Sequence, residues 1–349
     1  MKYRMLPNSE LRLSEIGYSL RRLVDQIGRR LSETEAQRLL GRCFDLGVTL
    51  FQTGDTFGFG ASEELLAKAL RSHRDEVVIA TLVGYDFYHR FENKLRTGQE
   101  VVPDFSPAFI RLSTEQALRR LKTDRIEVLK LHHPGRAEVE EDALWETLAA
   151  LRREGKILHF GAAFGPARGW LYESVDCIQH RAPAIVEQAC NLLEPFPTNQ
   201  VMRATYFALP EPGLAVEELP DFQHGRTSAE PQFKTRLLVR DPLCRGILIG
   251  NAAVAGEHPE WVRAARDFEF LTGKETGRTL GQAALLWLLA ERTVASCLVE
   301  ETDGERLAEL AAAPERNRLT REELERVDEL HRRDRRAQAQ PLAGTMKRP

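Results

Sequence analysis

Several polar residues lie at or just after the ends of short apolar runs, where a strand could present them together. These residues are Gln52, Asp55, His132, Glu187, Arg240 and Asp241. A histidine that faces a carboxylate can exchange a proton near neutral pH. An arginine beside them can hold the carboxylate or phosphate of a ligand. The residue types therefore predict acid–base chemistry on a small anionic molecule.

We assign a role to each candidate. His132 is the expected base or acid, Glu187 its opposite number and Arg240 the anion anchor. The predicted catalytic set comprises Gln52, Asp55, His132 and Glu187. The predicted substrate-binding set comprises Phe57, Tyr85, Tyr88, Arg240 and Asp241. In the alternative interpretation, Glu187 and Arg240 only neutralise each other and His132 is a hydrogen-bonded remnant.

Metal binding and cysteine chemistry are less favoured. The possible metal ligands come from separate strands without HxxxH or ExxH spacing: Asp55, His132, Glu187 and Asp241. His132 and His133 are not expected to form a ligand pair, because adjacent strand residues point to opposite faces. Cys190 could act as a nucleophile with a histidine, but a packed cysteine is the usual case. The five cysteines form no CxxC pair, so we predict no bound metal and no disulfide framework.

Strand-like and helix-like segments alternate along the chain. The apolar, strand-like runs are Leu13 to Tyr18, Val48 to Phe51, Val77 to Val83, Ile126 to Leu131, Ile157 to Ala163, Ala184 to Gln188, Thr235 to Val239 and Ala295 to Val299. Runs without polar alternation are typical of parallel strands that are buried on both faces. Eight of them fit a (β/α)8 TIM barrel, although a doubly wound open sheet has the same local pattern. No GxGxxG follows the first strand, which disfavours a dinucleotide-binding loop there.

One domain accounts for most of the chain. We predict a barrel over residues 1–331, with an N-terminal hairpin at Tyr3 to Ser14, and a flexible tail over residues 332–349. Two long connections, Tyr85 to Asp104 and Glu194 to Phe233, are expected above the C-terminal face. Active sites of such barrels lie on that face.

Composition narrows the class of protein. The 349 residues are 42% hydrophobic and 29% charged with a net charge of -3, which is ordinary for a globular protein and gives no basic footprint for nucleic acid. The first residues contain no apolar signal region, and the longest apolar stretch, Ala283 to Ala290, is too short to span a bilayer. These features predict a cytoplasmic protein without a membrane partner. They do not predict an oligomeric state.

The segment GVTLFQTGDTFGFGASEELLAKAL, from Gly47, closely resembles the aldo/keto reductase signature. Further similar segments follow in order: VVIATLVG from Val77, ALRRLKTDRIEVLKLHHP from Ala117, EGKILHFG from Glu154, NLLEP from Asn191, DPLCRGILIG from Asp241 and LTREELERVDEL from Leu319. The resemblance covers most of the chain. It implies a (β/α)8 barrel that binds NADP(H) across its C-terminal mouth.

The resemblance also implies a catalytic tetrad of Asp, Tyr, Lys and His. Position by position, these four residues fall on Gln52, Phe57, Leu82 and His132. Phenylalanine has no hydroxyl to donate, and leucine cannot lower the pKa of a neighbour, so standard carbonyl reduction is expected to fail. A substitute acid could come from the long third connection, at Tyr85, Tyr88 or His89.

The nicotinamide end of the implied cofactor site is altered too. The Ser-Asn pair of the family, which holds the carboxamide, falls on Ala163 and Phe164. The glutamine that accompanies this pair falls on Glu187, and the tyrosine that stacks on the ring falls on Arg240. The whole cradle for the ring is therefore replaced.

The phosphate end carries carboxylates. Where the family presents Gly, Lys or Arg, and Ser to the adenosine 2′-phosphate, this chain has Glu300, Thr302 and Asp303. Arg306 and Glu309 persist, but the usual asparagine is Leu310. Because carboxylates repel a phosphate, we expect NADP(H) binding to be lost and no cofactor to be used.

Three interpretations remain. The favoured one is a reductase-like barrel repurposed for cofactor-independent elimination, isomerisation or cyclisation of a small anionic metabolite. The second is a non-catalytic binding or regulatory partner, and the third is an atypical NAD(P)H-dependent oxidoreductase. Fold alone does not separate them, because function is set by the site.

Overall fold

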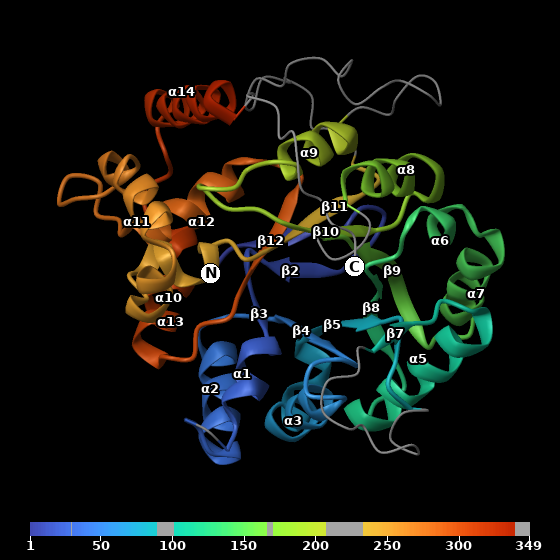
Figure 1. Cartoon of the computed structure of the whole chain (residues 1–349). Helices are drawn as coiled ribbons and strands as arrows, with labels where there is room; N and C mark the ends of the chain where they lie inside the picture. The colour runs from blue at the N-terminus through green and yellow to red at the C-terminus, as the bar shows by residue number, and fades with distance from the viewer. Residues whose placement is uncertain (29, 89–100, 166–169, 207–232, 339–349) are drawn as a thin grey trace.

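The computed structural model describes residues 1–28, 30–88, 101–165, 170–206 and 233–338. Eight parallel strands form a closed barrel in chain order (Figure 1). They are β3 (Ile16–Ser19), β4 (Leu50–Gly54), β5 (Val78–Val83), β8 (Ile126–His132), β9 (Ile157–Ala163), β10 (Ile185–Ala189), β11 (Arg236–Arg240) and β12 (Val294–Val299). The predicted (β/α)8 TIM barrel is thus confirmed.

Helices surround the strands on all sides in Figure 1. The α-helices are α1 (Arg21–Gln26), α2 (Glu33–Asp45), α3 (Ala61–Ala69), α5 (Pro107–Leu121), α6 (Arg136–Glu140), α7 (Asp142–Arg153), α8 (Leu171–Arg181), α9 (Thr198–Tyr206), α10 (Ala252–Glu257), α11 (Pro259–Arg266), α12 (Leu280–Ala290), α13 (Gly304–Ala311) and α14 (Arg321–Gln338). Short 3-10 segments occupy Arg71–Glu76, Cys244–Ile249, Glu269–Leu271 and Ala313–Glu315. None of the helices within the described ranges combines the length and apolar character needed to cross a membrane.

Two small antiparallel sheets flank the barrel. The predicted N-terminal hairpin is formed by β1 (Tyr3–Met5) and β2 (Arg12–Ser14). Leu6 and Leu13 from this hairpin join the apolar cluster inside the barrel, so the hairpin closes one end of it. The second sheet pairs β6 (Tyr85–Asp86) with β7 (Val102–Pro103) at the two ends of the long third connection.

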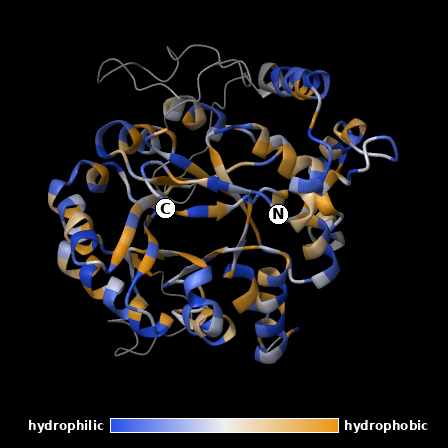
Figure 2. Cartoon of the chain, turned by 180° about the vertical axis from the view of Figure 1, so that it is seen from behind, coloured by the Kyte–Doolittle hydropathy of each residue, from blue (hydrophilic) through white to orange (hydrophobic). Residues whose placement is uncertain are grey.

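Two apolar cores make up most of the interior. The larger one lies between the strands and the helices, and Figure 2 shows hydrophobic residues concentrated on the strands and the helix sides that face them. The smaller one, inside the barrel, is built from side chains such as Leu50, Val128 and Leu238. Because strand side chains alternate between faces, the two cores follow from the continuous apolar runs of the sequence.

The C-terminal helix extends further than expected. We predicted a flexible tail from residue 332, but α14 continues to Gln338. Ion pairs one turn apart, Arg321 with Glu325 and Glu329 with Arg333, add to the stability of this charged helix, which also buries Val327 and His331. Residues 339–349 of the predicted tail, and residues 89–100 and 207–232 of the two long connections, lie outside the described ranges.

Candidate active site

A charged network fills the barrel above its inner apolar core. Lys130 on β8 has no exposed surface, and its ammonium donates hydrogen bonds to Gln52 Oε1 and Glu187 Oε2. The amide of Gln52 also donates to Glu187 Oε1 at 3.4 Å. Side chains alternate between the two faces of a strand. Each of these three residues stands an even number of positions from an inward-facing residue of its own strand, so its side chain points into the barrel. Predicted site residues Gln52 and Glu187 are therefore in contact.

Lys130 and Glu187 form a buried ion pair. Burial by itself would raise the pKa of Glu187, but the charges of Lys130 and Arg240 outweigh it and hold this pKa below its usual value. Burial lowers the pKa of Lys130, and the attraction of Glu187 offsets only part of that effect. Charges taken out of water persist only when they are paired in this manner.

Arg240 completes the network from β11. Its Nη1 lies 3.5 Å from Glu187 Oε1, which is long for a charge-assisted hydrogen bond, and this atom is buried without a hydrogen-bond partner among the described residues. A side chain at Gly165 would collide with Nη2 of Arg240. Glycine there lets the guanidinium lie against the backbone at the end of β9.

An apolar group occupies the positions that the resemblance assigns to the tyrosine and lysine of the tetrad. Phe57, Leu82 and Ala163 are all at least 94% buried and form one cluster, with Val24 packed against it. Leu82 and Lys130 are also register partners on adjacent strands. The ammonium inside this barrel therefore comes from the strand next to the one that the resemblance implies.

His132 ends strand β8 on the inner face. Burial lowers the pKa of His132 well below the usual value, and the positive charges of Arg240 and Lys130 lower it further, so the imidazole is neutral. Its Nδ1 is buried and has no hydrogen-bond partner within the described part of the chain. The ring of Tyr85 lies edge-on to it, with 4.9 Å between centroids.

The expectation that His132 and His133 point to opposite faces is wrong. Their ring centroids are only 4.5 Å apart, and the Tyr85 hydroxyl lies 3.4 Å from His133 Nδ1. The strand ends at His132, and His133 has a left-handed backbone with φ of 57°. Strand alternation no longer applies at such a residue. The two histidines and Tyr85 therefore form one aromatic cluster.

Two predicted site residues lie elsewhere. Asp55 is fully buried beside Glu63 and Arg120, and burial, with the charge of Glu63, raises its pKa well above the usual value. Tyr88 accepts a hydrogen bond from Arg120, at 2.9 Å, and burial raises its pKa to about 12. Glu63 itself binds Arg120 and Thr81. This second cluster lies between the strands and helices α3 and α5.

Asp241 lines a small cavity of about 40 Å³ next to Arg22 and Glu300. Burial raises the pKa of Asp241 to about 6, although the Arg245 amide donates to its carboxylate. Ser19 donates to Glu300 at 2.8 Å. The lining of this cavity thus combines three carboxylates, Asp241, Glu300 and Glu301, with two guanidinium groups, Arg22 and Arg245, rather than a set of cations.

The residues at the phosphate end do not fit NADP(H). Asp303 accepts hydrogen bonds from the amides of Glu305 and Arg306, at 3.0 and 2.9 Å, and so caps helix α13. Glu301 accepts from the amides of Thr302 and Asp303. Amides at a helix N-terminus are the groups that hold a phosphate in many proteins. Here the chain's own carboxylates occupy them.

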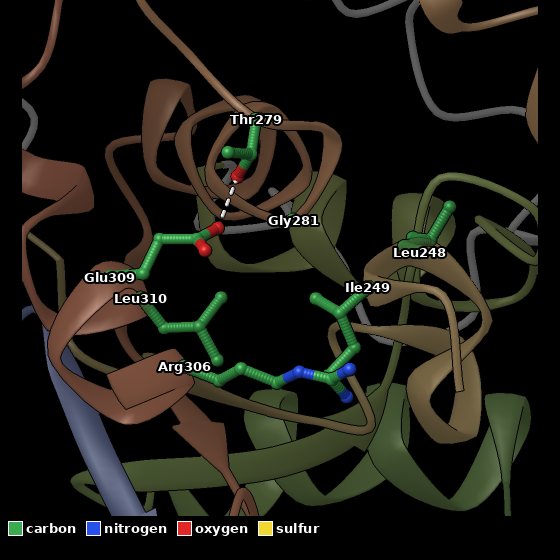
Figure 3. Close-up of a pocket in the computed structure, with 7 residues that line it drawn as sticks. All are labelled: Leu248, Ile249, Thr279, Gly281, Arg306, Glu309 and Leu310. Atoms are coloured by element: carbon green, nitrogen blue, oxygen red, sulfur yellow. Dashed lines mark hydrogen bonds between the residues drawn. The ribbon is translucent and has the colours of Figure 1, made fainter. Parts of the chain in front are cut away.

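A larger cavity, of about 270 Å³, lies beyond this capped end. Its walls are Leu248, Ile249, Thr279, Gly281, Arg306, Glu309 and Leu310. In Figure 3, Thr279 and Glu309 meet through a hydrogen bond on one side, and Arg306 extends toward Ile249 on the other. The residues Arg306 and Glu309, which persist from the family pattern, therefore face open space.

No described group of three or more His, Cys, Asp or Glu side chains has the arrangement of a metal site. All five cysteines are buried and unpaired. Burial raises the pKa of the Cys190 thiol, which opposes a role as nucleophile.

Sequence reasoning missed Lys130. The signal was present, because Lys130 stands two residues before His132 in an apolar run and must therefore share its face. A lysine inside a strand that is buried on both faces requires a carboxylate nearby, which Glu187 provides.

The closed barrel with a polar mouth is the architecture of (β/α)8 enzymes. The model of the aldo/keto reductase family matches residues 22–332. The chain belongs to the aldo/keto reductase family.

Similar proteins agree with this assignment. The uncharacterized oxidoreductase YqkF of Bacillus subtilis is 24% identical over 96% of this chain and 98% of that protein. The L-glyceraldehyde 3-phosphate reductase of Escherichia coli K12 is also 24% identical, over 94% of this chain and 92% of that protein.

Solved structures show the same fold. The aldo-keto reductase AKR11C1 of Bacillus halodurans has a TM-score of 0.74 at 23% identity, covering 95% of this chain and 96% of that one. The glycerol dehydrogenase AKR11B4 of Gluconobacter oxydans has a TM-score of 0.72 at 20% identity, covering 95% of each chain. At these identities the likeness supports the fold alone.

Proposed function

We propose that this barrel does not reduce carbonyls with NADP(H) and instead performs cofactor-independent acid–base chemistry on a small anionic metabolite. One observation carries the proposal. The position of the family's acid holds Phe57, packed against Leu82, whereas two cations, Lys130 and Arg240, share the single carboxylate of Glu187. An elimination, isomerisation or cyclisation needs proton transfer and a charge anchor but no hydride donor.

Arg240 is the proposed anchor. Its unpartnered Nη1 and its long contact to Glu187 leave hydrogen-bonding capacity for a ligand. Counting Lys130, Arg240 and Glu187, the inner network carries one more positive than negative charge. Because an uncompensated buried charge is unfavourable, a bound monoanion would stabilise this region.

His132 is the proposed proton acceptor. Burial lowers the pKa of this imidazole, and the charges of Arg240 and Lys130 lower it further. A bound anion would oppose those charges and raise the pKa of the imidazole. Proton uptake at the free Nδ1 would then accompany ligand binding, which suits a base that acts only on bound substrate.

Glu187 is the proposed partner in this chemistry, and Gln52 orients it. The carboxylate accepts from Lys130 and from the Gln52 amide, so its position is fixed from two sides. Glu187 and Lys130 can pass a proton between them across this hydrogen bond. The predicted roles of Asp55 and Tyr88 are not part of this proposal, since both belong to the cluster around Arg120.

An atypical nicotinamide-dependent oxidoreductase is the second candidate. It is favoured by the cavity beside Arg306, Glu309 and Leu310, at the end where the family binds adenosine. The carboxylates of Asp303 and Glu301 oppose it, because they occupy the amides that a phosphate would need. The relatives named oxidoreductases make this candidate worth testing directly.

A ligand screen by thermal denaturation tests the proposal. We expect no rise in Tm with NADPH or NADH and a rise with at least one small carboxylate such as pyruvate, since a ligand of the native state must stabilise it. Arg240→Gln should abolish that rise. The surface variant Arg111→Gln, which removes an exposed ion pair with Glu154, is the matched control. A micromolar Kd for either nucleotide would make the second candidate the better one.

A further inference from the structure

Lys130 is a buried amine to which the proposed acid–base chemistry gives only a supporting role. It lies two residues before His132 on the inner face of β8, and its ammonium contacts Gln52 and Glu187. A fully enclosed lysine in a barrel is unusual, because lysine is almost never completely buried. What surrounds it indicates a chemical reason for its position.

Burial makes this amine a better nucleophile than a surface lysine. Removal from water lowers the pKa of Lys130, and Glu187 counters only part of that shift. A larger fraction of the amine is then uncharged near neutral pH. A desolvated lysine amine attacks carbonyl carbon atoms to give imines.

The neighbours of Lys130 are the groups that such a reaction needs. Glu187 is hydrogen-bonded to the ammonium and can accept its proton. Arg240 contacts the same carboxylate, so an acid group bound to the guanidinium would lie close to the amine. In a 2-oxo carboxylate, the carbonyl carbon is directly bonded to that acid group.

We propose that Lys130 forms an imine with a small 2-oxo carboxylate that Arg240 anchors. The inference rests on the proposed function, since it uses the same anion anchor and the same base. It adds a substrate class and a covalent step that the acid–base proposal does not require.

The step balances without an oxidant or reductant. The ammonium of Lys130 transfers one proton to Glu187, and the free amine adds to the carbonyl carbon. A proton moves from nitrogen to oxygen in the adduct, and Glu187 then returns its proton to the hydroxyl, which leaves as water. The product is a protonated imine. Neutral His132 can then remove a proton from the carbon atom next to the imine carbon, which gives an enamine.

Access to the amine sets a limit on the substrate. Lys130 has no exposed surface, whereas the Arg240 side chain is 18% exposed. We therefore expect a ligand to approach Lys130 from the side of Arg240. We expect the reaction to be restricted to compounds about as small as pyruvate.

Borohydride trapping tests the inference. The full-length protein is incubated with pyruvate at pH 7, treated with sodium borohydride, and analysed by intact mass and peptide mapping. The expected result is one reduced adduct on Lys130, about tenfold above any other lysine, because its lowered pKa leaves more free amine and Arg240 holds the acid group close to it. Labelling confined to surface lysines, or no labelling, would overturn the inference.

Variants sharpen the experiment. Lys130→Arg keeps the charge and should abolish the adduct, and the matched control Lys68→Arg, which alters an exposed ion pair with Glu33, should leave it unchanged. Arg240→Gln should lower labelling by pyruvate about tenfold but not labelling by the uncharged probe acetaldehyde. Equal loss with both probes would contradict the anchor role.

The two proposals fail in different ways. Mapping on the wild-type protein decides the covalent step even when a Lys130 variant does not fold. A rise in Tm with pyruvate that depends on Arg240, without any borohydride adduct, would refute the imine and leave the acid–base function standing. Absence of both would count against both proposals.

Discussion

Two buried polar clusters lie on opposite sides of the same barrel wall, and they differ in charge balance. In the outer cluster, Glu63 pairs with Arg120, and burial raises the pKa of Asp55 well above its usual value. In the inner cluster, Lys130 and Arg240 share Glu187. The ion pair of the outer cluster therefore joins one cation to one carboxylate, whereas the inner cluster has two cations for one carboxylate. A balanced ion pair is expected of a structural element, whereas a surplus of buried positive charge is expected of an anion-binding site.

Breaking the ion pair of Glu63 and Arg120 in the outer cluster should have the largest effect on stability. Arg120→Met leaves Glu63 buried without a counter-ion and should lower the free energy of unfolding by about 3 kcal/mol at pH 7, measured by urea denaturation. The exposed pair of Arg111 and Glu154 provides the control, since Arg111→Met should cost less than about 1 kcal/mol. Equal costs would show that the outer cluster is not structural.

Breaking the inner pair should cost less. Lys130→Met removes one of two cations, and Arg240 remains to balance Glu187, so we expect a loss of about 2 kcal/mol. The surplus charge disappears as well, and carboxylates should no longer raise the Tm. A variant that still gains stability from pyruvate would place the anion site elsewhere.

Asp55 makes the contribution of the outer cluster to the free energy of unfolding depend on pH. Its pKa is raised in the folded protein, so the native state holds this proton where the unfolded chain has lost it. Stability from this group is therefore present at low pH and declines as pH rises above about 4, the unfolded value. Asp55→Asn removes the titration, and the difference in unfolding free energy between variant and wild type should grow with pH. A difference independent of pH would show that Asp55 is ionised.

Restoring the family tetrad should have the smallest effect, because we expect no reductase activity to appear. The triple change Gln52→Asp, Phe57→Tyr and Leu82→Lys should yield no NADPH-dependent reduction of a generic aldehyde. A hydride donor must be held about 3 to 3.5 Å from its target, and the altered ring cradle and the capped α13 do not provide for one. Measurable turnover would mean that cofactor binding has survived and that only the acid was lost.

The barrel could be predicted from the sequence because its signal is repeated. Each strand is a short apolar run, and helical segments separate the runs, so errors of up to three residues at the strand ends leave the predicted topology unchanged. The contact between Glu187 and Arg240 followed in the same way, because neighbouring strands end on the same face.

The other parts of the candidate site depend on residues that follow the end of a strand. Asp55 follows the end of β4 at Gly54, and His133 follows the end of β8 with a left-handed backbone. Side-chain direction at both positions is set by the turn and not by alternation. Lys130 is different, because alternation fixes the direction of its side chain, and the structure adds the ion pair with Glu187.

Carboxylates of the chain itself occupy the amides at the N-terminus of α13 and just before it. Asp303 and Glu301 are joined to the helix by only a few bonds, so their carboxylates compete with any dissolved phosphate as intramolecular ligands. A short tether gives such a group an effective concentration in the millimolar range or above. A phosphate would therefore have to displace carboxylates that dilution or dialysis of the protein cannot remove.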